Sequence, residues 1–388
     1  MPAGAIVKFD VESWQQLISG KKQGLAAGGL RSILLVLSFG YGLVMIIRNW
    51  MYNAGMLRQH RVDVPVVVVG NLTVGGTGKT PVVEWIARYY RQLDCRVTLL
   101  SRGYQSSVGQ NDEAMLLEAN LVDVPHLQGR DRVALARTAI DELESELLLL
   151  DDGFQHRRLA RNLDIVLIDV TRPFGYGYCL PRGMLREPIS SLRRAGLVLL
   201  TRTDQIDIQQ ANVIEKRIKT IVPNCPVVWC RHAPLHLQNS EQERTAGELD
   251  GKRVAAFCGI GNAESFFQML RSLNADMIAT KTFPDHHNYT RTDVESLAAW
   301  SRQQPEGTWI ITTQKDWVKL QCNELGNKPL WFLRIGIEVT RNQELLESSI
   351  QQAIGKADKD CPSSSFRSIN PFLSFRKDAY DSANTQPV

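Results

Sequence analysis

The chain has 388 residues, which is long for a single domain, so we expect two domains. Its composition, 44% hydrophobic and 22% charged, is typical of a globular protein and excludes a largely disordered chain. The formal net charge of +4 gives no overall electrostatic support for nucleic-acid binding. Its seven cysteines show no C-x-x-C spacing, which indicates a reducing compartment with neither disulfides nor a zinc site.

A run without charged residues extends from Ser32 to Ile47 near the N-terminus. As a helix it would be roughly 24 Å long, shorter than the roughly 20 residues that usually span a bilayer. Trp50, Tyr52 and several arginines follow, as is typical of a membrane interface. We therefore expect residues 1–60 to form a membrane-anchor region, with its helix either spanning the membrane or embedded in one leaflet. The alternative is a buried core helix.

The strongest motif begins with four valines, Val66 to Val69, which predict a buried parallel strand. A glycine-rich loop ending in Gly-Lys-Thr follows, and then an amphipathic run that predicts a helix. This order is the context of a P-loop, in which backbone N–H groups and a lysine hold nucleotide phosphates. Thr73 occupies the place of the first glycine in the usual pattern. The expected nucleotide-binding residues are Thr73, Val74, Gly75, Gly76, Thr77, Gly78, Lys79 and Thr80.

A second motif is the apolar stretch that ends in Asp151 and Asp152. In P-loop enzymes an aspartate near the phosphate site, together with the hydroxyl that follows the lysine, holds Mg²⁺. We expect Thr80 and Asp151 or Asp152 to be the metal ligands. The alternative is a solvated turn after an ordinary strand.

Phosphoryl transfer also needs positive charge at the transition state, and two arginines are candidates. Arg132 lies at a predicted helix start, and Arg186 lies in the basic loop LPRGMLREPISSLRRA, which would suit a phosphate-bearing substrate. Glu187, next to Arg186, belongs to the same expected catalytic set. An ordinary solvated loop is the alternative.

The segments GNLTVGGTGKTP, SRGY, LLDDGFQH, LPRGMLREPISSLRRA, FPDHHNY and TTQKDWVKL occur in this order. By these motifs the sequence resembles the tetraacyldisaccharide 4'-kinase family over roughly residues 30–335. The resemblance implies ATP- and Mg²⁺-dependent phosphorylation of the 4'-hydroxyl of a lipid-A disaccharide 1-phosphate. It also implies an inner-membrane enzyme whose catalytic body faces the cytoplasm. The expected partners are the lipid disaccharide and the membrane surface, with no nucleic acid and no obligate protein partner.

The resemblance further implies that an Asp–His pair, matched here by Asp112 and His286, accepts the proton of the acceptor alcohol. His287 stays open as an alternative to His286, and a helix N-cap is the simpler interpretation of Asp112. This region departs from the family pattern, since Asn111-Asp112-Glu113-Ala114 stands where the family usually has G-D-E-P, after a shorter loop.

The expected fold is α/β, with a P-loop NTPase-like doubly wound sheet, a second, smaller α/β domain and the N-terminal anchor helix. The P-loop kinase domain is expected over residues 61–229 and the smaller domain over 230–325. Residues 326–354 are expected to return to the linker, and residues 355–388 to be a disordered tail.

Two other functions compete with the kinase. A membrane-tethered P-loop NTPase switch would need the P-loop and the aspartate pair, but neither the basic loop nor the DHH segment. A soluble small-molecule kinase would turn residues 32–47 into core. Thr313-Gln314-Lys315-Asp316 does not match the Asn/Thr-Lys-x-Asp motif of a guanine-specific switch. ATP turnover with and without a lipid acceptor would distinguish these functions.

Overall fold

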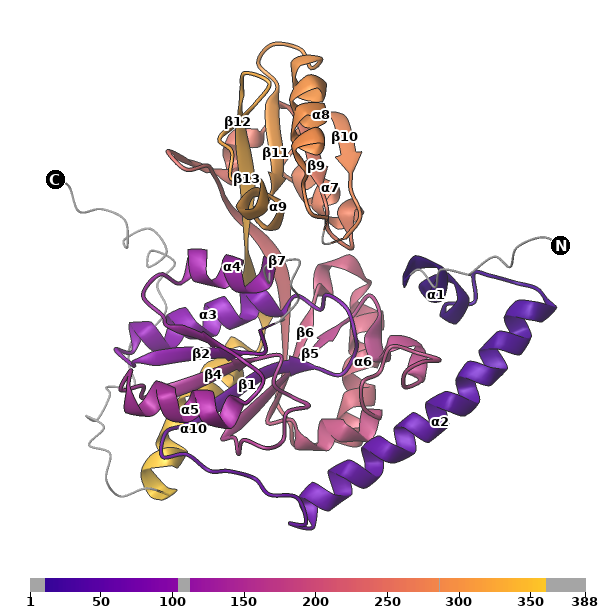
Figure 1. The fold of residues 1–388 in the computed structure, drawn as a ribbon, viewed down its shortest axis with the longest axis vertical. Coiled ribbons are helices and arrows are strands. Elements are labelled where there is room, and N and C mark those ends of the chain that lie inside the picture. The colour runs from indigo at the N-terminus through magenta and orange to yellow at the C-terminus, as the bar shows by residue number, and fades with distance from the viewer. Residues whose placement is uncertain (1–10, 104–111, 286, 361–388) are drawn as a thin grey trace.

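The computed structural model describes residues 11–103, 112–285 and 287–360. All strands of the described chain belong to one sheet, in the order β10-β9-β11-β13-β7-β6-β5-β1-β4-β2-β3, with β8 on β7 and β12 on β13. Figure 1 shows two lobes that this sheet joins. The large lobe comprises residues 11–103, 112–226 and 342–360, the small lobe comprises residues 239–285 and 287–327, and β7 and β13 connect them.

The strands of the large lobe are parallel and, apart from the short edge strand His126–Gln128, are almost entirely buried, which explains their continuous apolar sequences. They are β1 (Val66–Asn71), β2 (Val97–Ser101), β3 (His126–Gln128), β4 (Leu147–Asp151), β5 (Leu163–Asp169) and β6 (Leu197–Thr201). Alternate residues face opposite sides of this sheet. Val67 and Val69 pack with α3, α4 and α10, whereas Val66 and Val68 pack with α5. The large lobe is therefore doubly wound, as predicted.

The helices of the large lobe are α3 (Lys79–Gln92), α4 (Asp112–Asn120), α5 (Arg132–Asp141), α6 (Ile208–Ile221) and α10 (Gln343–Asp360). The short 3-10 helices η1 (Pro173–Gly177), η2 (Ile189–Arg194) and η3 (Thr203–Gln205) lie in its loops. Most of the expected disordered tail, residues 361–388, lies outside the described residues. Helix α10 itself continues to Asp360, beyond the expected start of that tail at residue 355.

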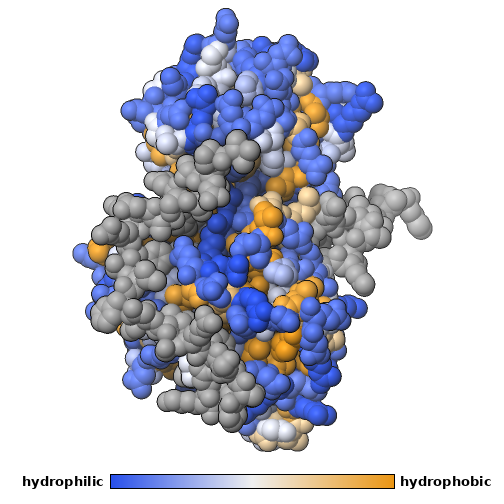
Figure 2. Space-filling view, turned by 90° about the vertical axis from the view of Figure 1, so that its left-hand side faces the viewer, coloured by the Kyte–Doolittle hydropathy of each residue, from blue (hydrophilic) through white to orange (hydrophobic). Residues whose placement is uncertain are grey.

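The small lobe has its own parallel strands, β9 (Arg253–Cys258), β10 (Asp276–Thr282) and β11 (Trp309–Thr313). Helix α7 (Ala263–Ser272) packs on one face of them, and α8 (Arg291–Arg302) and α9 (Gln314–Leu320) pack on the other. The remaining elements are β8 (Glu243–Thr245), η4 (Ala246–Leu249) and β12 (Glu324–Leu325). In the view of Figure 2 the small lobe, above, is mostly hydrophilic, and hydrophobic patches gather on the large lobe below.

Two long antiparallel strands connect the lobes, β7 (Val227–Gln238) and β13 (Lys328–Arg341). Strand β7 begins in parallel beside β6, and β13 pairs in parallel with β11, so the same two strands belong to both lobes. The expected domain boundary at residue 230 falls inside β7, and the one at residue 326 falls just before β13.

Helices α1 (Val11–Ile18) and α2 (Leu25–Asn53) lie on the outside of the large lobe (Figure 1). Helix α2 is long and apolar enough to cross a membrane, and 11% of its most apolar window is buried. Its outward stripe is exposed at Val36, Phe39 and Leu43, among others. A buried core helix, the alternative interpretation of residues 32–47, does not fit this exposure.

Candidate active site

The glycine-rich loop lies between β1 and α3, at the carboxyl edge of the parallel sheet. The backbone of Gly78 is left-handed, with φ at +80°, and a Cβ there would lie 2.4 Å from Nε2 of His232, so only glycine fits. Thr77 accepts hydrogen bonds from residues at the ends of β1 and β6. The Asn71 amide donates to its hydroxyl at 3.0 Å, and the Thr201 hydroxyl donates to its carbonyl at 3.0 Å. Because α3 begins at Lys79, its N-terminal N–H groups point toward this loop, an arrangement suited to phosphate.

Lys79 is almost buried and lies beside the aspartate pair. Its Nζ is 3.5 Å from Oδ1 of Asp152, whose carboxylate also accepts hydrogen bonds of 2.9 and 2.8 Å from Arg186. Burial raises the pKa of Asp152, but Lys79 and Arg186 outweigh it and hold that pKa below its usual value. Three expected site residues, from the P-loop, the end of β4 and the basic loop, therefore meet at one point.

Asp151 has a different environment from its neighbour. It is the last residue of β4, is buried, and its Oδ1 has no hydrogen-bond partner among the described residues. Burial raises its pKa to about 7; Lys79 opposes this shift, and Glu113 and Asp152 add to it. A buried carboxylate oxygen without a partner, next to a phosphate loop, is a suitable ligand for a bound cation.

These residues fit Mg²⁺. This ion is usually held by one or two protein oxygens together with substrate phosphates and water, so it needs no protein cage. Among the described residues, no group of three His, Cys, Asp or Glu is placed to hold a metal. Asp151 and the Thr80 hydroxyl are the residues that would hold it, since Asp152 is already engaged by Arg186 and Lys79.

Asp112 is the first residue of α4 and is 8% exposed. Its Oδ2 lies 2.5 Å from Nζ of Lys319, a residue of α9 in the small lobe. Asp112 is thus at the junction of the two lobes.

The histidine expected to accompany Asp112, His286, lies outside the described residues. The alternative, His287, has Nε2 3.1 Å from Oδ2 of Asp293 and stacks on Phe283, with ring centroids 4.9 Å apart. These contacts hold His287 within the small lobe.

Arg132 and Glu187 complete the expected set. Arg132 is buried at the start of α5 and donates to the carbonyl of Gly129 at 3.2 Å. Burial lowers the pKa of His156, and the charge of Arg132 lowers it further. Glu187 is fully buried between Arg48, at 3.7 Å, and Arg194, at 2.9 Å. Glu187 thus helps to dock α2 on the large lobe, and its place in the expected catalytic set stays a prediction.

A second group of residues around the loop was not predicted from the sequence. Arg202, after β6, contacts Asp169 at the end of β5 and donates to the carbonyl of Gly76 at 3.1 Å. His232 of β7 is buried against Gly78, and burial together with the charge of Arg202 lowers its pKa to about 4. The signal available in the sequence was that β5 and β6 end in polar residues, since ligands bind at the carboxyl ends of parallel strands.

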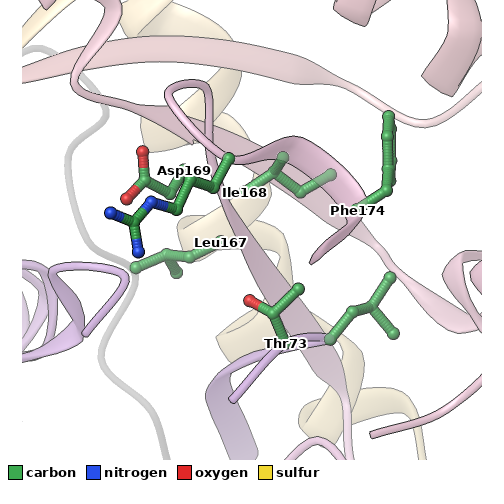
Figure 3. A pocket seen from close by; sticks show the side chains of 7 residues that line it. Thr73, Leu167, Ile168, Asp169 and Phe174 are labelled. Carbon is green, nitrogen blue, oxygen red and sulfur yellow. The ribbon is translucent and has the colours of Figure 1, made fainter. Parts of the chain in front are cut away.

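A small pocket opens at this edge, beside the start of the loop (Figure 3). Leu72 and Thr73 of the loop and the end of β5 line it, together with Arg172 and Phe174. The pocket extends the polar edge of the sheet from the phosphate loop toward β5.

The doubly wound sheet, the glycine-rich loop and the buried lysine beside an aspartate pair define a P-loop nucleotide-binding protein with a second α/β lobe. The sequence profile of the tetraacyldisaccharide-1-P 4'-kinase family matches residues 30–355, so the chain belongs to this family. The family predicted from the motifs is therefore confirmed.

Similar proteins agree with this assignment. The chain is 37% identical to the tetraacyldisaccharide 4'-kinase of Anaeromyxobacter sp. (strain Fw109-5), over 80% of this chain and 88% of that protein. It is 39% identical to that of Syntrophotalea carbinolica, over 74% and 83%. A crystal structure of LpxK from Aquifex aeolicus in complex with ATP has a TM-score of 0.68 and 30% identity, covering 84% of this chain and 99% of that one. The predicted fold class is confirmed by this structure.

Proposed function

We propose that the protein is an ATP-dependent kinase that phosphorylates the 4'-hydroxyl of a tetraacyldisaccharide 1-phosphate in lipid A biosynthesis. The observation that carries this proposal is the family match over residues 30–355, together with the cluster of Lys79, Asp152 and Arg186. The match covers both lobes, so the proposal rests on more than a nucleotide-binding loop.

The proposed roles follow from position and charge. The loop from Thr73 to Thr80 binds the phosphates of ATP, and Lys79 adds a cation there. Asp151 and Thr80 hold Mg²⁺, which when bound offsets the charge of the phosphates. Arg186 stays near the phosphate site through its contact with Asp152, where a guanidinium would stabilise transition-state charge. Arg132 is proposed for the same task.

We assign the acceptance of the alcohol proton to Asp112 with His286. Asp112→Ala and His286→Ala are each expected to lower kcat about 10²-fold or more, as is typical of general base catalysis. The double variant should be little slower than the slower single variant, since residues that act as a unit are not additive. Losses that multiply fully, measured at saturating ATP and acceptor, would contradict a pair, and an unaffected Asp112→Ala would contradict the base assignment.

Helix α2 is proposed to attach the protein to the inner membrane, with the catalytic body in the cytoplasm, where ATP is available. Its inward stripe is docked on the large lobe along much of its length. The Ser38 hydroxyl donates to the carbonyl of Cys179 at 2.8 Å, the Tyr41 hydroxyl to that of Arg186 at 2.9 Å, and Arg157 to that of Asn49 at 2.9 Å. A helix docked in this way favours attachment within one leaflet, with the exposed apolar stripe in the lipid.

The same docking supports a lipid acceptor, because α2 and the basic loop with Arg186 then share the membrane surface with the substrate. The competing function is a membrane-tethered NTPase switch without an acceptor. Release of ADP, measured in vesicles with and without tetraacyldisaccharide 1-phosphate, tests the proposal. A kinase shows ADP release that depends on the acceptor and equals the amount of phosphorylated lipid, whereas acceptor-independent release would contradict it.

A further inference from the structure

Helix α9 of the small lobe contacts α4 of the large lobe, and none of the roles proposed above involves α9. Its residue Lys319 is nearly buried, with 8% of its side chain exposed. The Nζ of Lys319 lies 2.5 Å from Oδ2 of Asp112 and donates to the backbone carbonyl of His287 at 3.1 Å. One ammonium group therefore joins the start of α4 to the segment that follows β10, which contains the DHH motif.

The start of α9 is fixed within the small lobe by Asp316, which is fully buried. Its carboxylate accepts hydrogen bonds from the Gly259 backbone N–H at 3.0 Å, from the Thr313 hydroxyl at 2.6 Å and from the Tyr289 hydroxyl at 2.9 Å. Tyr289 follows the DHH segment in the chain. Helix α9 is thus bonded to Tyr289 and to the end of β11, and Lys319 extends from this helix to Asp112.

A second contact sets the position of α9 relative to α4. Gln314, the first residue of α9, donates to Asn120 at the end of α4 at 2.6 Å. Asn120 in turn donates at 2.8 Å to Glu84 of α3, the helix that begins with Lys79. Both ends of α4 are therefore bonded to α9, and the second bond continues to the phosphate-binding helix.

We propose that Lys319 is a positioning residue that holds the carboxylate of Asp112 in register with the backbone of His287, so that the acceptor hydroxyl meets a correctly placed base. This inference rests on the proposed function, since it assumes that Asp112 receives the proton. The physical reason is geometric. A misplacement of about 1 Å at a reacting group costs on the order of 10²-fold in rate, so a cation that fixes the position of the Asp112 carboxylate affects kcat.

The test compares Lys319→Met, which removes the charge and retains the length of the side chain, with Lys319→Arg, which retains a cation. The matched control is Lys328→Met, at the start of the connecting strand β13. Its ammonium also holds two partners, the carbonyls of Ser301 at 3.0 Å and Gln304 at 2.8 Å, and it has no place in the proposed site. Thermal unfolding is followed for each variant, and Lys319→Gln replaces Lys319→Met if the latter unfolds below the assay temperature.

We expect Lys319→Met to lower kcat roughly 10- to 100-fold, with KM for ATP within about twofold of wild type, because the phosphate loop is untouched. Lys319→Arg should lose less, and Lys328→Met should retain the wild-type kcat. In an Asp112→Asn background, Lys319→Met should cause little further loss. A wild-type kcat for Lys319→Met, an equal loss in Lys319→Arg and Lys319→Met, or a full further loss in the Asp112→Asn background would each overturn the inference.

The same series separates this inference from the proposed function. An Asp112→Asn enzyme with wild-type kcat would remove the base assignment, and the inference would fall with it. An impaired Asp112→Asn enzyme together with an unimpaired Lys319→Met enzyme would overturn the positioning role alone and leave the base assignment intact.

Discussion

A single guanidinium nitrogen of Arg186 donates to both carboxylate oxygens of Asp152, at 2.9 and 2.8 Å, while Lys79 lies 3.5 Å from one of them. Two cations therefore share one carboxylate, and the cluster keeps a net positive charge of the kind that binds a triphosphate. The same carboxylate orients both cations toward one point. The first two predictions concern this cluster and the aspartate next to it.

Lys79→Met is expected to lower kcat for transfer at least about 10²-fold, because it removes the only lysine of the phosphate loop. Steady-state kinetics of the full-length protein measures the change. Lys252→Met, an exposed lysine outside the proposed site, is the control and should behave as wild type. A folded Lys79→Met enzyme with a nearly normal kcat would rule out the P-loop assignment.

Asp151 should make both stability and Mg²⁺ activation depend on pH. Its pKa of about 7 lies above the value in the unfolded chain, so the folded protein binds more protons between about pH 4 and 7. In the absence of Mg²⁺, stability should therefore fall as the pH rises through this window. Mg²⁺ competes with the proton, so its apparent activation constant should rise roughly tenfold for each pH unit below 7.

Asp151→Asn should remove this pH dependence and severely weaken Mg²⁺ activation. Magnesium titrations of the rate at several pH values are the measurement. Asp123→Asn, whose side chain is 62% exposed, serves as the control. If Asp151→Asn retained the wild-type Mg²⁺ titration, another oxygen ligand would hold the metal.

Glu84 should be important for stability, because it is buried beside two arginines. Its carboxylate contacts Arg334 of β13 and accepts a hydrogen bond from Arg88 at 3.1 Å. Glu84→Ala leaves Arg334 buried without its partner, which costs about 3–5 kcal/mol in the free energy of unfolding. Urea unfolding tests this, and Glu295→Ala, at a side chain 64% exposed, should change it by less than about 1 kcal/mol. Equal effects of the two changes would refute the role of Glu84.

The outward stripe of α2 should determine membrane attachment. The triple change of Val36, Phe39 and Leu43 to serine removes three side chains that are 71, 67 and 57% exposed. Since burial of one such side chain is worth about 1.5–3 kcal/mol, partition into phospholipid vesicles should fall more than about tenfold. The control is Ile208→Ser with Val213→Ser, each 65% exposed on α6. Unchanged vesicle binding by a folded triple variant would exclude this stripe as the membrane contact.

The sequence predicted features that depend on neighbours in the chain. Four valines, a glycine-rich loop and Gly-Lys-Thr are contiguous, and so is the apolar run that ends in Asp151, so the local pattern identified them without tertiary information. The family motifs extended this to the fold and the activity. The separate environments of Asp151 and Asp152 were not predictable, since these depend on Arg186, which comes from a loop 34 residues later.

Glu187 illustrates the limit in a different way. It follows Arg186 directly in the chain, yet Arg186 contacts Asp152 whereas Glu187 contacts Arg48 of α2, and no local pattern distinguishes these two environments. His232 and Arg202 belong to no motif and meet the loop only because β5, β6 and β7 are neighbours in the sheet. The contact between Lys319 and Asp112 joins two lobes and has no local signal.

The fate of the γ-phosphate of ATP tests the central claim most directly. The full-length protein is incubated with γ-labelled ATP and tetraacyldisaccharide 1-phosphate in vesicles, and the labelled product is located by mass spectrometry and NMR. We expect one new phosphate, on the 4'-oxygen of the disaccharide, formed at least about 10²-fold more slowly by Lys79→Met. Label found only as inorganic phosphate, or on a different hydroxyl, would contradict it.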